Sequence, residues 1–437
     1  MGHPETQAGS GLTDRLRQRC LSAAPQVFAP AEQLRRSLRA NFCKGQIKLA
    51  RLFVVNTGLP NQGQAGQFGA MKIPILTPLA QSLPATVPFV GPEAQERARG
   101  RAFAARLGAN ESRFGPSPRA VAAMQAAAAD AWMYGDPECH DLKAAIAAHH
   151  GVTPAHVVVG EGIDGLLGLL VRLLVGPGDA VVTSAGAYPT FNFHVTGFGG
   201  VLYRAPYAGD FEDPVALLAL ARATRARLIY LANPDNPMGS HHPSTTIAAM
   251  IEALPDGCLL VLDEAYVDLA PEATAVDVAV DDPRLIRLRT FSKAHGLAGL
   301  RLGYGLAAPG LALAFDKVRN HFGVGRIAQA GGIAALGDGA HLAAVRAWAL
   351  AGRLRLGAIA RDNRLTPLPS ATNFVTLDCG RDGDYARALL KALTARDIFV
   401  RMPGTAPLDR CIRVSLGDAA EMARFAAALP MALRDVA

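Results

Sequence analysis

The sequence predicts an α/β fold with two parts: a large domain built on a mostly parallel sheet covered by helices on both faces, and a smaller α+β domain. Between residues 115 and 310, short apolar runs alternate with Ala- and Leu-rich stretches of helical spacing. The runs are continuously apolar, which is typical of strands buried on both faces. With 437 residues, half of them hydrophobic, the chain can bury a core of this size.

Six apolar runs are expected as strands, at residues 156–159, 180–183, 228–231, 258–262, 285–288 and 302–305. Helices are expected between them, for example at 164–174 and 214–222. We expect residues 111–339 to form the large domain, and residues 71–110 and 340–437 to pack together as the small one. Ligands of parallel sheets bind beyond the carboxyl ends of the strands, so the polar residues after each run are the candidates for a site.

Residues 1–70 differ from the rest of the chain in charge. They hold nine of the 44 Lys and Arg and three of the 37 Asp and Glu, so the remaining 35 basic and 34 acidic residues nearly balance. The net charge of +7 therefore gives no reason to expect nucleic-acid binding. We expect this stretch to be disordered, or to result from a start codon placed upstream of Met71.

The chain offers no sign of a membrane, metal or disulfide protein. No run of about 18 uncharged apolar residues is present, so no membrane span is expected. The six cysteines are scattered without the spacing of a zinc site. These features favour a reduced, cytoplasmic protein without disulfides.

Three polar loops follow the first three apolar runs. Gly160-Glu-Gly-Ile-Asp-Gly165 could hold a phosphate at a helix N-terminus, although an ordinary strand-to-helix turn explains it equally well. An aromatic ring in Tyr188-Pro-Thr-Phe191 could lie flat on a planar ligand or simply pack in the core. Asn233-Pro-Asp-Asn-Pro-Met-Gly239 is a stiff turn that would fix the amide of Asn236.

Charged residues follow the next two runs. Asp263 ends an apolar strand, where a carboxylate needs a cationic partner, a metal or a helix N-terminus. The stretch Asp263-Glu-Ala-Tyr266 does not clearly provide the further ligands that a metal would need. Thr290-Phe-Ser-Lys293 comes after the fifth run and Arg301 lies eight residues later, which favours an anionic ligand.

These side chains would meet at one edge of the sheet, and together they predict a site for pyridoxal phosphate. Lys293 would bind the cofactor covalently as an imine and, once released, carry the proton. Asp263 would keep the pyridine nitrogen protonated. Asn236 and Tyr266 would bind the phenolic oxygen. The phosphate would be held by Gly162, Ile163, Ser292 and Arg301.

At these residues the sequence resembles the aspartate-aminotransferase superfamily of pyridoxal-phosphate fold type I, and within it the histidinol-phosphate aminotransferases. The most specific matches are Val261-Leu-Asp-Glu-Ala-Tyr-Val-Asp268 and Leu288-Arg-Thr-Phe-Ser-Lys-Ala-His-Gly-Leu-Ala-Gly-Leu-Arg-Leu-Gly303. The resemblance extends from about residue 85 to 430, and Ala109-Asn-Glu-Ser112 and Tyr134-Gly-Asp136 support it. It implies a homodimer with shared sites, in which Tyr134 reaches the neighbouring subunit's cofactor phosphate. It also implies that Phe191 stacks on the cofactor ring, and that the substrate is bound by Asn110, Asn373, Arg401 and Arg413.

Two departures from the family's pattern concern the substrate. The family's Pro-Tyr element, which supplies a hydroxyl to a substrate phosphate, corresponds here to Pro88-Phe89. Arg401 is followed by Met402, where the family usually has an acid. The cofactor site therefore looks complete and the substrate-phosphate site incomplete, which favours an aromatic or other neutral amino acid.

The predicted function is an aminotransferase that exchanges an amino group between an amino acid, or an amino-alcohol phosphate of the histidinol-phosphate type, and a 2-oxo acid. One alternative on the same scaffold is a decarboxylase or lyase of the threonine-phosphate decarboxylase type, which needs no 2-oxo acid. Another is a non-catalytic, pyridoxal-phosphate-binding regulator. A regulator would need a helix-turn-helix module, and residues 1–70 show no clear pair of amphipathic helices.

Overall fold

The computed structural model describes residues 75–85, 90–276 and 280–436. The predictions made for residues 1–70 and for Pro88-Phe89 lie outside these ranges. Within them, none of the helices combines the length and the apolar character needed to cross a lipid bilayer.

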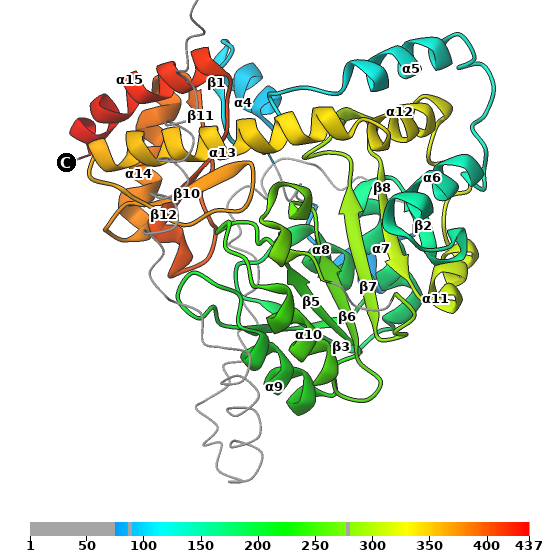
Figure 1. The fold of residues 1–437 in the computed structure, drawn as a ribbon. Helices are drawn as coiled ribbons and strands as arrows, with labels where there is room; N and C mark the ends of the chain where they lie inside the picture. The colour runs from blue at the N-terminus through cyan, green and yellow to red at the C-terminus, as the bar shows by residue number, and fades with distance from the viewer. Residues whose placement is uncertain (1–74, 86–89, 277–279, 437) are drawn as a thin grey trace, which may run out of the picture. The chain divides into compact units, whose positions relative to one another are not determined.

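A seven-stranded sheet forms the centre of the large domain (Figure 1). Its order is β2-β8-β7-β6-β5-β3-β4, with β8 antiparallel to both of its neighbours and the remaining pairs parallel. The strands are β2 (Val157–Gly160), β3 (Ala180–Ser184), β4 (Val201–Ala205), β5 (Leu228–Ala232), β6 (Leu259–Asp263), β7 (Leu285–Thr290) and β8 (Gly303–Ala307). The mostly parallel sheet and its six predicted strands are thus confirmed.

Strand β4 was not predicted, because it lacks a continuous buried run. It lies at the edge of the sheet, where its residues Val201 and Arg204 are exposed. Only β3 pairs with it, and as an edge strand it needs fewer apolar side chains than the central strands.

Helices cover both faces of this sheet, as alternate residues of the strands require. Tyr230 and Val261 pack in the same cluster as α7 (Gly162–Leu174) and α8 (Pro189–Gly197). Leu231 and Leu262 point to the opposite face, toward α9 (Pro214–Thr224) and α10 (Ser244–Glu252). Outside β2 and β8, a further layer is formed by α5 (Pro118–Ala128), α6 (His140–His150) and α12 (Arg326–Leu336).

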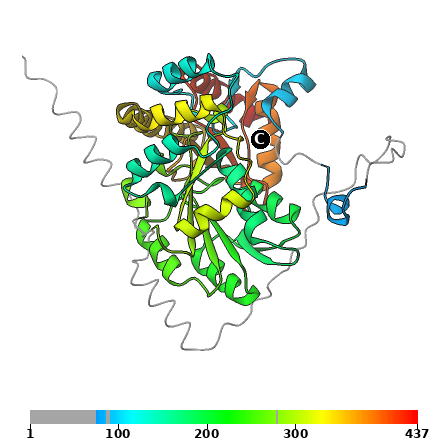
Figure 2. The ribbon, with the colours of Figure 1, turned by 90° about the vertical axis from the view of Figure 1, so that its right-hand side faces the viewer.

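The C-terminal part of the chain consists of a small antiparallel sheet and the helices that pack against it. Its order is β12-β10-β9, from β9 (Thr366–Pro367), β10 (Phe374–Asp378) and β12 (Cys411–Ser415). The strand β1 (Ala105–Arg106), far away in sequence, pairs with β11 (Ile398–Phe399). Helices α13 (Gly339–Asp362), α14 (Gly383–Ala395) and α15 (Ala419–Asp435) complete it, and α14 and α15 lie side by side (Figure 2).

The predicted domain boundary near residue 339 coincides with the start of α13, whose first turn is capped by the Asp338 side chain. The boundary itself stays a prediction. The remaining helices are α3 (Pro78–Ser82), α4 (Pro92–Arg99) and α11 (Pro309–Ala314), with short 3₁₀ turns at Pro154–His156, Val267–Leu269, Glu272–Thr274, Ala298–Leu300, Phe315–Lys317 and Leu408–Arg410.

Candidate active site

A cavity of about 440 Å³ opens at the carboxyl ends of β5, β6 and β7. Its walls come from the ends of these strands, from residues 108–111 and from residues 401–404 and 413 of the C-terminal part. Four basic side chains line it, Lys293, Arg301, Arg401 and Arg413, and the acidic side chains that line it are those of Glu111, Asp164 and Asp263. The excess of basic groups suits an anionic ligand.

Lys293 lies in the wall of the cavity, three residues after the end of β7. Its Nζ donates a hydrogen bond to the carbonyl oxygen of Asn110 at 3.1 Å. Burial, together with the charge of Arg413, lowers the pKa of Lys293 to about 8. A fraction of the amine is therefore uncharged near neutral pH, as a nucleophile or a proton carrier requires.

Asp263 ends β6 and lines the cavity with both carboxylate oxygens hydrogen-bonded. Tyr230 Oη donates to Oδ2 at 2.7 Å, and the backbone N–H of Ala265 donates to Oδ1 at 2.9 Å. Burial raises the pKa of Asp263 to about 6, and the two donated hydrogen bonds oppose that rise. The carboxylate is thus mainly ionised at neutral pH and can accept a charged N–H.

Tyr266 and Asn236 lie in the same cavity wall. The Tyr266 hydroxyl accepts a hydrogen bond from Asn110 Nδ2 at 3.1 Å, and burial raises the pKa of Tyr266 to about 12, so the hydroxyl stays protonated. Asn236 Oδ1 accepts a hydrogen bond from Arg413. Its amide nitrogen is therefore oriented by the arginine, and the turn that the two X-Pro steps impose positions the residue.

The predicted anion cradle lies at the N-terminus of α7. Gly162 has a φ of +75°, and a Cβ at this position would lie 2.7 Å from a guanidinium nitrogen of Arg301. Glycine adopts this positive φ without strain and leaves room for Arg301 beside the first turn of the helix. Arg301 also donates to Ser292 Oγ at 3.4 Å, and Ser292 is fixed by Thr290, whose hydroxyl lies 2.9 Å away.

Two arginines of the C-terminal part line the opposite wall. Arg401 and Arg413 are paired through their backbones, with N···O distances of 3.2 and 2.6 Å. Burial lowers the pKa of Arg413 to about 10, and the charge of Arg401 adds to that effect. Arg413 donates to the carbonyl of Gly108 at 3.0 Å, while its buried Nε has no partner among the described residues.

Four predicted site residues, Gly162, Phe191, Asn373 and Tyr134, are not among those that line the cavity. Phe191, the predicted stacking ring, is fully buried and stacks on Tyr230 with the centroids 4.7 Å apart. Tyr188, at the start of α8, lines the cavity instead, because the helix that begins at Pro189 turns Phe191 into the core. Asn373 lies behind the cavity wall and donates to the carbonyl of Asn110 at 3.0 Å. Tyr134 is 77% exposed and contacts Phe322.

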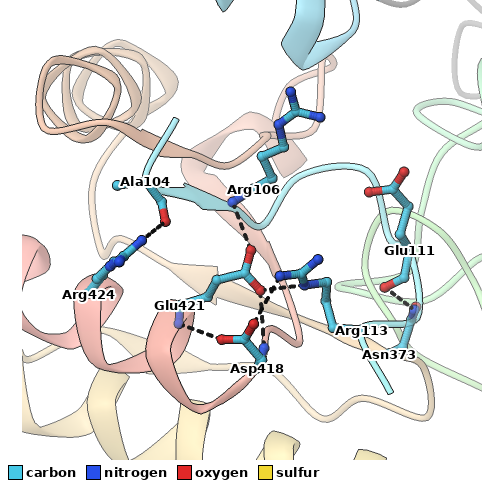
Figure 3. A network of polar contacts seen from close by, with 8 residues as sticks. All are labelled: Ala104, Arg106, Glu111, Arg113, Asn373, Asp418, Glu421 and Arg424. Carbon is cyan, nitrogen blue, oxygen red and sulfur yellow. Dashed lines mark hydrogen bonds and ion pairs between the residues drawn. The ribbon is translucent and has the colours of Figure 1, made fainter. Parts of the chain in front are cut away.

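The segment from Asn110 to Arg113 ties the cavity to the C-terminal part of the chain (Figure 3). Asn373 also donates to the carbonyl of Glu111 at 3.3 Å. Arg113 forms ion pairs with Glu421 at 2.7 Å and Asp418 at 2.9 Å, both at the start of α15. Asn110 has a φ of 56°, a left-handed conformation that asparagine tolerates, and these contacts hold it there.

Sequence reasoning assigned no role to Tyr230 and Asp164, both in the cavity wall. Asp164 accepts hydrogen bonds from Tyr188 at 3.0 Å and Arg301 at 3.3 Å, so it orients the aromatic wall and the cradle together. The residue that could have drawn attention is Tyr230, a hydroxyl inside an otherwise aliphatic strand that is buried throughout.

These residues fit pyridoxal phosphate. Gly162 and Arg301 form a cradle that a Cβ would fill, the buried Asp263 suits a protonated ring nitrogen, and Lys293 lines the same cavity. When bound, the cofactor withdraws electrons from the carbon next to the substrate nitrogen. Lys293, with its lowered pKa, would then add and remove the proton at that carbon. Arg413 would hold the substrate's anionic group.

Comparison with known proteins shows the family to which the chain belongs. The family model "Aminotransferase class I and II" matches residues 105–429. A histidinol-phosphate aminotransferase of Anaeromyxobacter sp. is 38% identical over 368 residues, which cover 82% of this chain and 98% of that protein.

Solved structures agree as well. The histidinol-phosphate aminotransferase of Sinorhizobium meliloti, solved in complex with pyridoxal-5'-phosphate, has a TM-score of 0.81 and 55% identity, covering 84% of this chain and 99% of that one. A double mutant of the aspartate aminotransferase of Thermus thermophilus shares the fold, with a TM-score of 0.67 at 22% identity over 82% of this chain and 100% of that chain. The chain therefore belongs to the class I and II aminotransferase family and is a pyridoxal-phosphate-dependent aminotransferase.

Proposed function

We propose that the amino substrate of this enzyme is an amino-alcohol phosphate of the histidinol-phosphate type, and that the acceptor is a 2-oxo acid. The observation that carries the proposal is the pair Arg401 and Arg413, which line one wall of the cavity side by side. A phosphate monoester carries a charge near −2 at pH 7, and two guanidinium groups match it. The names of the relatives support the same substrate.

The same arginines would serve the acceptor in the second half of the reaction. A 2-oxo dicarboxylic acid also presents two negative charges, and in a ping-pong reaction it occupies the cavity after the first product has left. The apolar Met402 beside Arg401 is the feature that favours a neutral or aromatic amino acid instead. The wall formed by Arg401 and Met402 therefore decides between a phosphorylated and a neutral amino substrate.

The first half-reaction distinguishes a phosphorylated from a neutral amino substrate. The holoenzyme would be mixed with histidinol phosphate, histidinol or phenylalanine, and the loss of the cofactor's yellow absorption band followed. We expect histidinol phosphate to react with the highest ratio of rate constant to half-saturation concentration. Arg401→Gln should lower that ratio for histidinol phosphate by more than tenfold, roughly the contribution of one charge-assisted hydrogen bond, and change it little for phenylalanine. A preference for phenylalanine over histidinol phosphate would overturn the proposal.

We also infer a cytoplasmic homodimer whose subunits share their active sites. Trp132, Tyr134 and Phe322 are 81%, 77% and 52% exposed, and the ring centroids of Tyr134 and Phe322 lie 4.8 Å apart. Exposed aromatic side chains gathered in this way are typical of protein interfaces. Tyr134 would reach the phosphate site of the neighbouring subunit.

Mixing two inactive variants tests the shared site. Lys293→Ala removes the cofactor lysine, and Tyr134→Ala removes the side chain that would cross the interface. If the sites are shared, exchange of subunits produces a hybrid with one intact site, and activity rises toward about a quarter of the wild-type level, as random pairing predicts. A monomer in sedimentation equilibrium, or no recovery after proven subunit exchange, would contradict the inference.

A further inference from the structure

Tyr230 stands out among the buried residues of the large sheet. It is fully buried in β5, its ring lines the cavity, and its other face is covered by Phe191 at an interplanar angle of 16°. The ring is thus held by packing from behind. Its hydroxyl reaches across to the neighbouring strand β6 and donates to Asp263 Oδ2 at 2.7 Å.

The strand register explains why this hydrogen bond forms. Ala232 of β5 lies opposite Asp263 of β6, and Tyr230, two residues earlier, projects from the same face of the sheet. A diagonal neighbour on a parallel pair is within reach of a long aromatic side chain. Phe191 stacks on the Tyr230 ring, so the packing favours the ring orientation from which the hydroxyl donates to Asp263.

The electrostatic setting makes this hydroxyl consequential. Asp263 is buried, and the negative charges of Asp164 and Glu264 also disfavour its ionised form. The two groups that favour ionisation are the hydroxyl of Tyr230 and the N–H of Ala265. Burial raises the pKa of Tyr230 well above its ordinary value, so the hydroxyl remains a donor near neutral pH.

We propose that Tyr230 is a positioning residue for the cofactor: its hydroxyl orients the Asp263 carboxylate and favours its ionised form, so that the carboxylate can pair with a protonated ring nitrogen. With one oxygen held by Tyr230 and the other by Ala265, the carboxyl plane is fixed before the cofactor arrives. The inference concerns the cofactor site alone and does not depend on which amino substrate the enzyme uses.

The test is Tyr230→Phe in the full-length protein, with Tyr304→Phe as a matched control. Tyr304 is also a buried tyrosine of the large sheet, and its hydroxyl lies 2.8 Å from His150 Nε2, outside the cavity. Both variants keep the ring and lose one buried hydroxyl. A role in stability alone would thus affect the two proteins in the same way.

The measurement is the dissociation constant of pyridoxal phosphate and of its 1-deaza analogue, in which C–H replaces the ring nitrogen, without any amino substrate. Tyr230→Phe should bind pyridoxal phosphate about tenfold more weakly, the effect of losing one hydrogen bond to a charged group, and bind the deaza analogue as the wild type does. Tyr304→Phe should leave both constants unchanged. An unchanged ratio of the two constants in Tyr230→Phe would overturn the proposal.

A second variant covers the case in which Tyr230→Phe does not fold. Replacing Tyr230 with 3-fluorotyrosine keeps the packing against Phe191 and makes the hydroxyl a stronger donor. The dissociation constant of pyridoxal phosphate should then fall relative to that of the deaza analogue. A ratio equal to that of the wild type would count against the proposal. Either outcome is independent of the substrate assay, so a failure here is distinct from a failure of the proposed substrate.

Discussion

Glu264→Gln should destabilise the protein strongly, although Glu264 does not line the cavity. Its carboxylate accepts hydrogen bonds from Arg287 at 3.1 Å twice and from Arg289 at 2.9 Å. The side chains of Glu264, Arg287 and Arg289 are 1%, 9% and 8% exposed. Removing the negative charge leaves two guanidinium groups in the interior, and among the described residues Asp268, 3.2 Å from Arg289, is then their one ion-pair partner.

The size of the effect follows from this geometry. Breaking a buried ion pair by removing one partner costs about 3–5 kcal/mol, since the remaining charge is left unpaired in a poorly polar environment. We expect the lower end, about 3 kcal/mol, because Gln retains one acceptor and Asp268 still pairs with Arg289. The expected loss is a large share of the free energy of unfolding of an ordinary domain.

Urea unfolding followed by circular dichroism measures it. The matched control is Asp384→Asn, which breaks the pair between Asp384 and Arg387, whose side chains are 87% and 53% exposed. This variant should unfold at the urea concentration of the wild type, since exposed pairs contribute little. If Glu264→Gln lowered the free energy of unfolding by less than about 1 kcal/mol, the ion pairs of Glu264 with Arg287 and Arg289 would not stabilise the fold as argued, and the reasoning would be refuted.

Three further predictions concern the acid pair beneath the Asn236 turn and the aromatic residues beside the cavity. Burial raises the pKa of Asp235 from 3.8 to about 7, beside Glu212, whose pKa burial also raises. Because this pKa is higher in the folded than in the unfolded protein, its contribution to stability is present below the unfolded value and is lost as the pH rises through 7. In thermal unfolding, the stability of Asp235→Asn relative to the wild type should therefore increase from pH 5 to pH 8. A stability difference that does not change with pH would contradict this. Phe191→Ala should lower the free energy of unfolding in urea by about 3–5 kcal/mol, as expected for a buried ring. A loss below about 1 kcal/mol would contradict this and would mean that neighbouring side chains fill the space left by the ring. Tyr188→Ala should instead weaken binding of pyridoxal phosphate by more than Phe191→Leu does, and the reverse order in equilibrium dialysis would restore Phe191 as the cofactor's stacking ring.

The sequence was sufficient for the sheet and for much of the cavity because both depend on local patterns. Continuous apolar runs marked β2, β3 and β5 to β8, and polar residues after those runs, such as Asp263 and Lys293, do line the cavity. In a parallel sheet the position of a residue at a strand end already fixes the edge at which it lies. For these residues no knowledge of distant contacts was needed.

Other features depend on how a helix is rotated or on contacts between distant segments. Tyr188 and Phe191 are three residues apart, and only the start of α8 decides which ring faces the cavity. The bond between Tyr230 and Asp263 requires the register of β5 against β6, which no spacing in the sequence reveals. Asn373 was predicted to bind the substrate, and in the structure its side chain instead donates to the carbonyl of Asn110.

The central claim is that Lys293 carries the cofactor, and one measurement tests it directly. The protein would be reconstituted with pyridoxal phosphate, reduced with borohydride, digested and analysed by mass spectrometry. We predict that the added mass of the cofactor is found on the peptide containing Lys293 and is absent from Lys293→Ala treated in the same way. Cofactor mass on a different lysine, or none on the wild-type protein, would contradict the account.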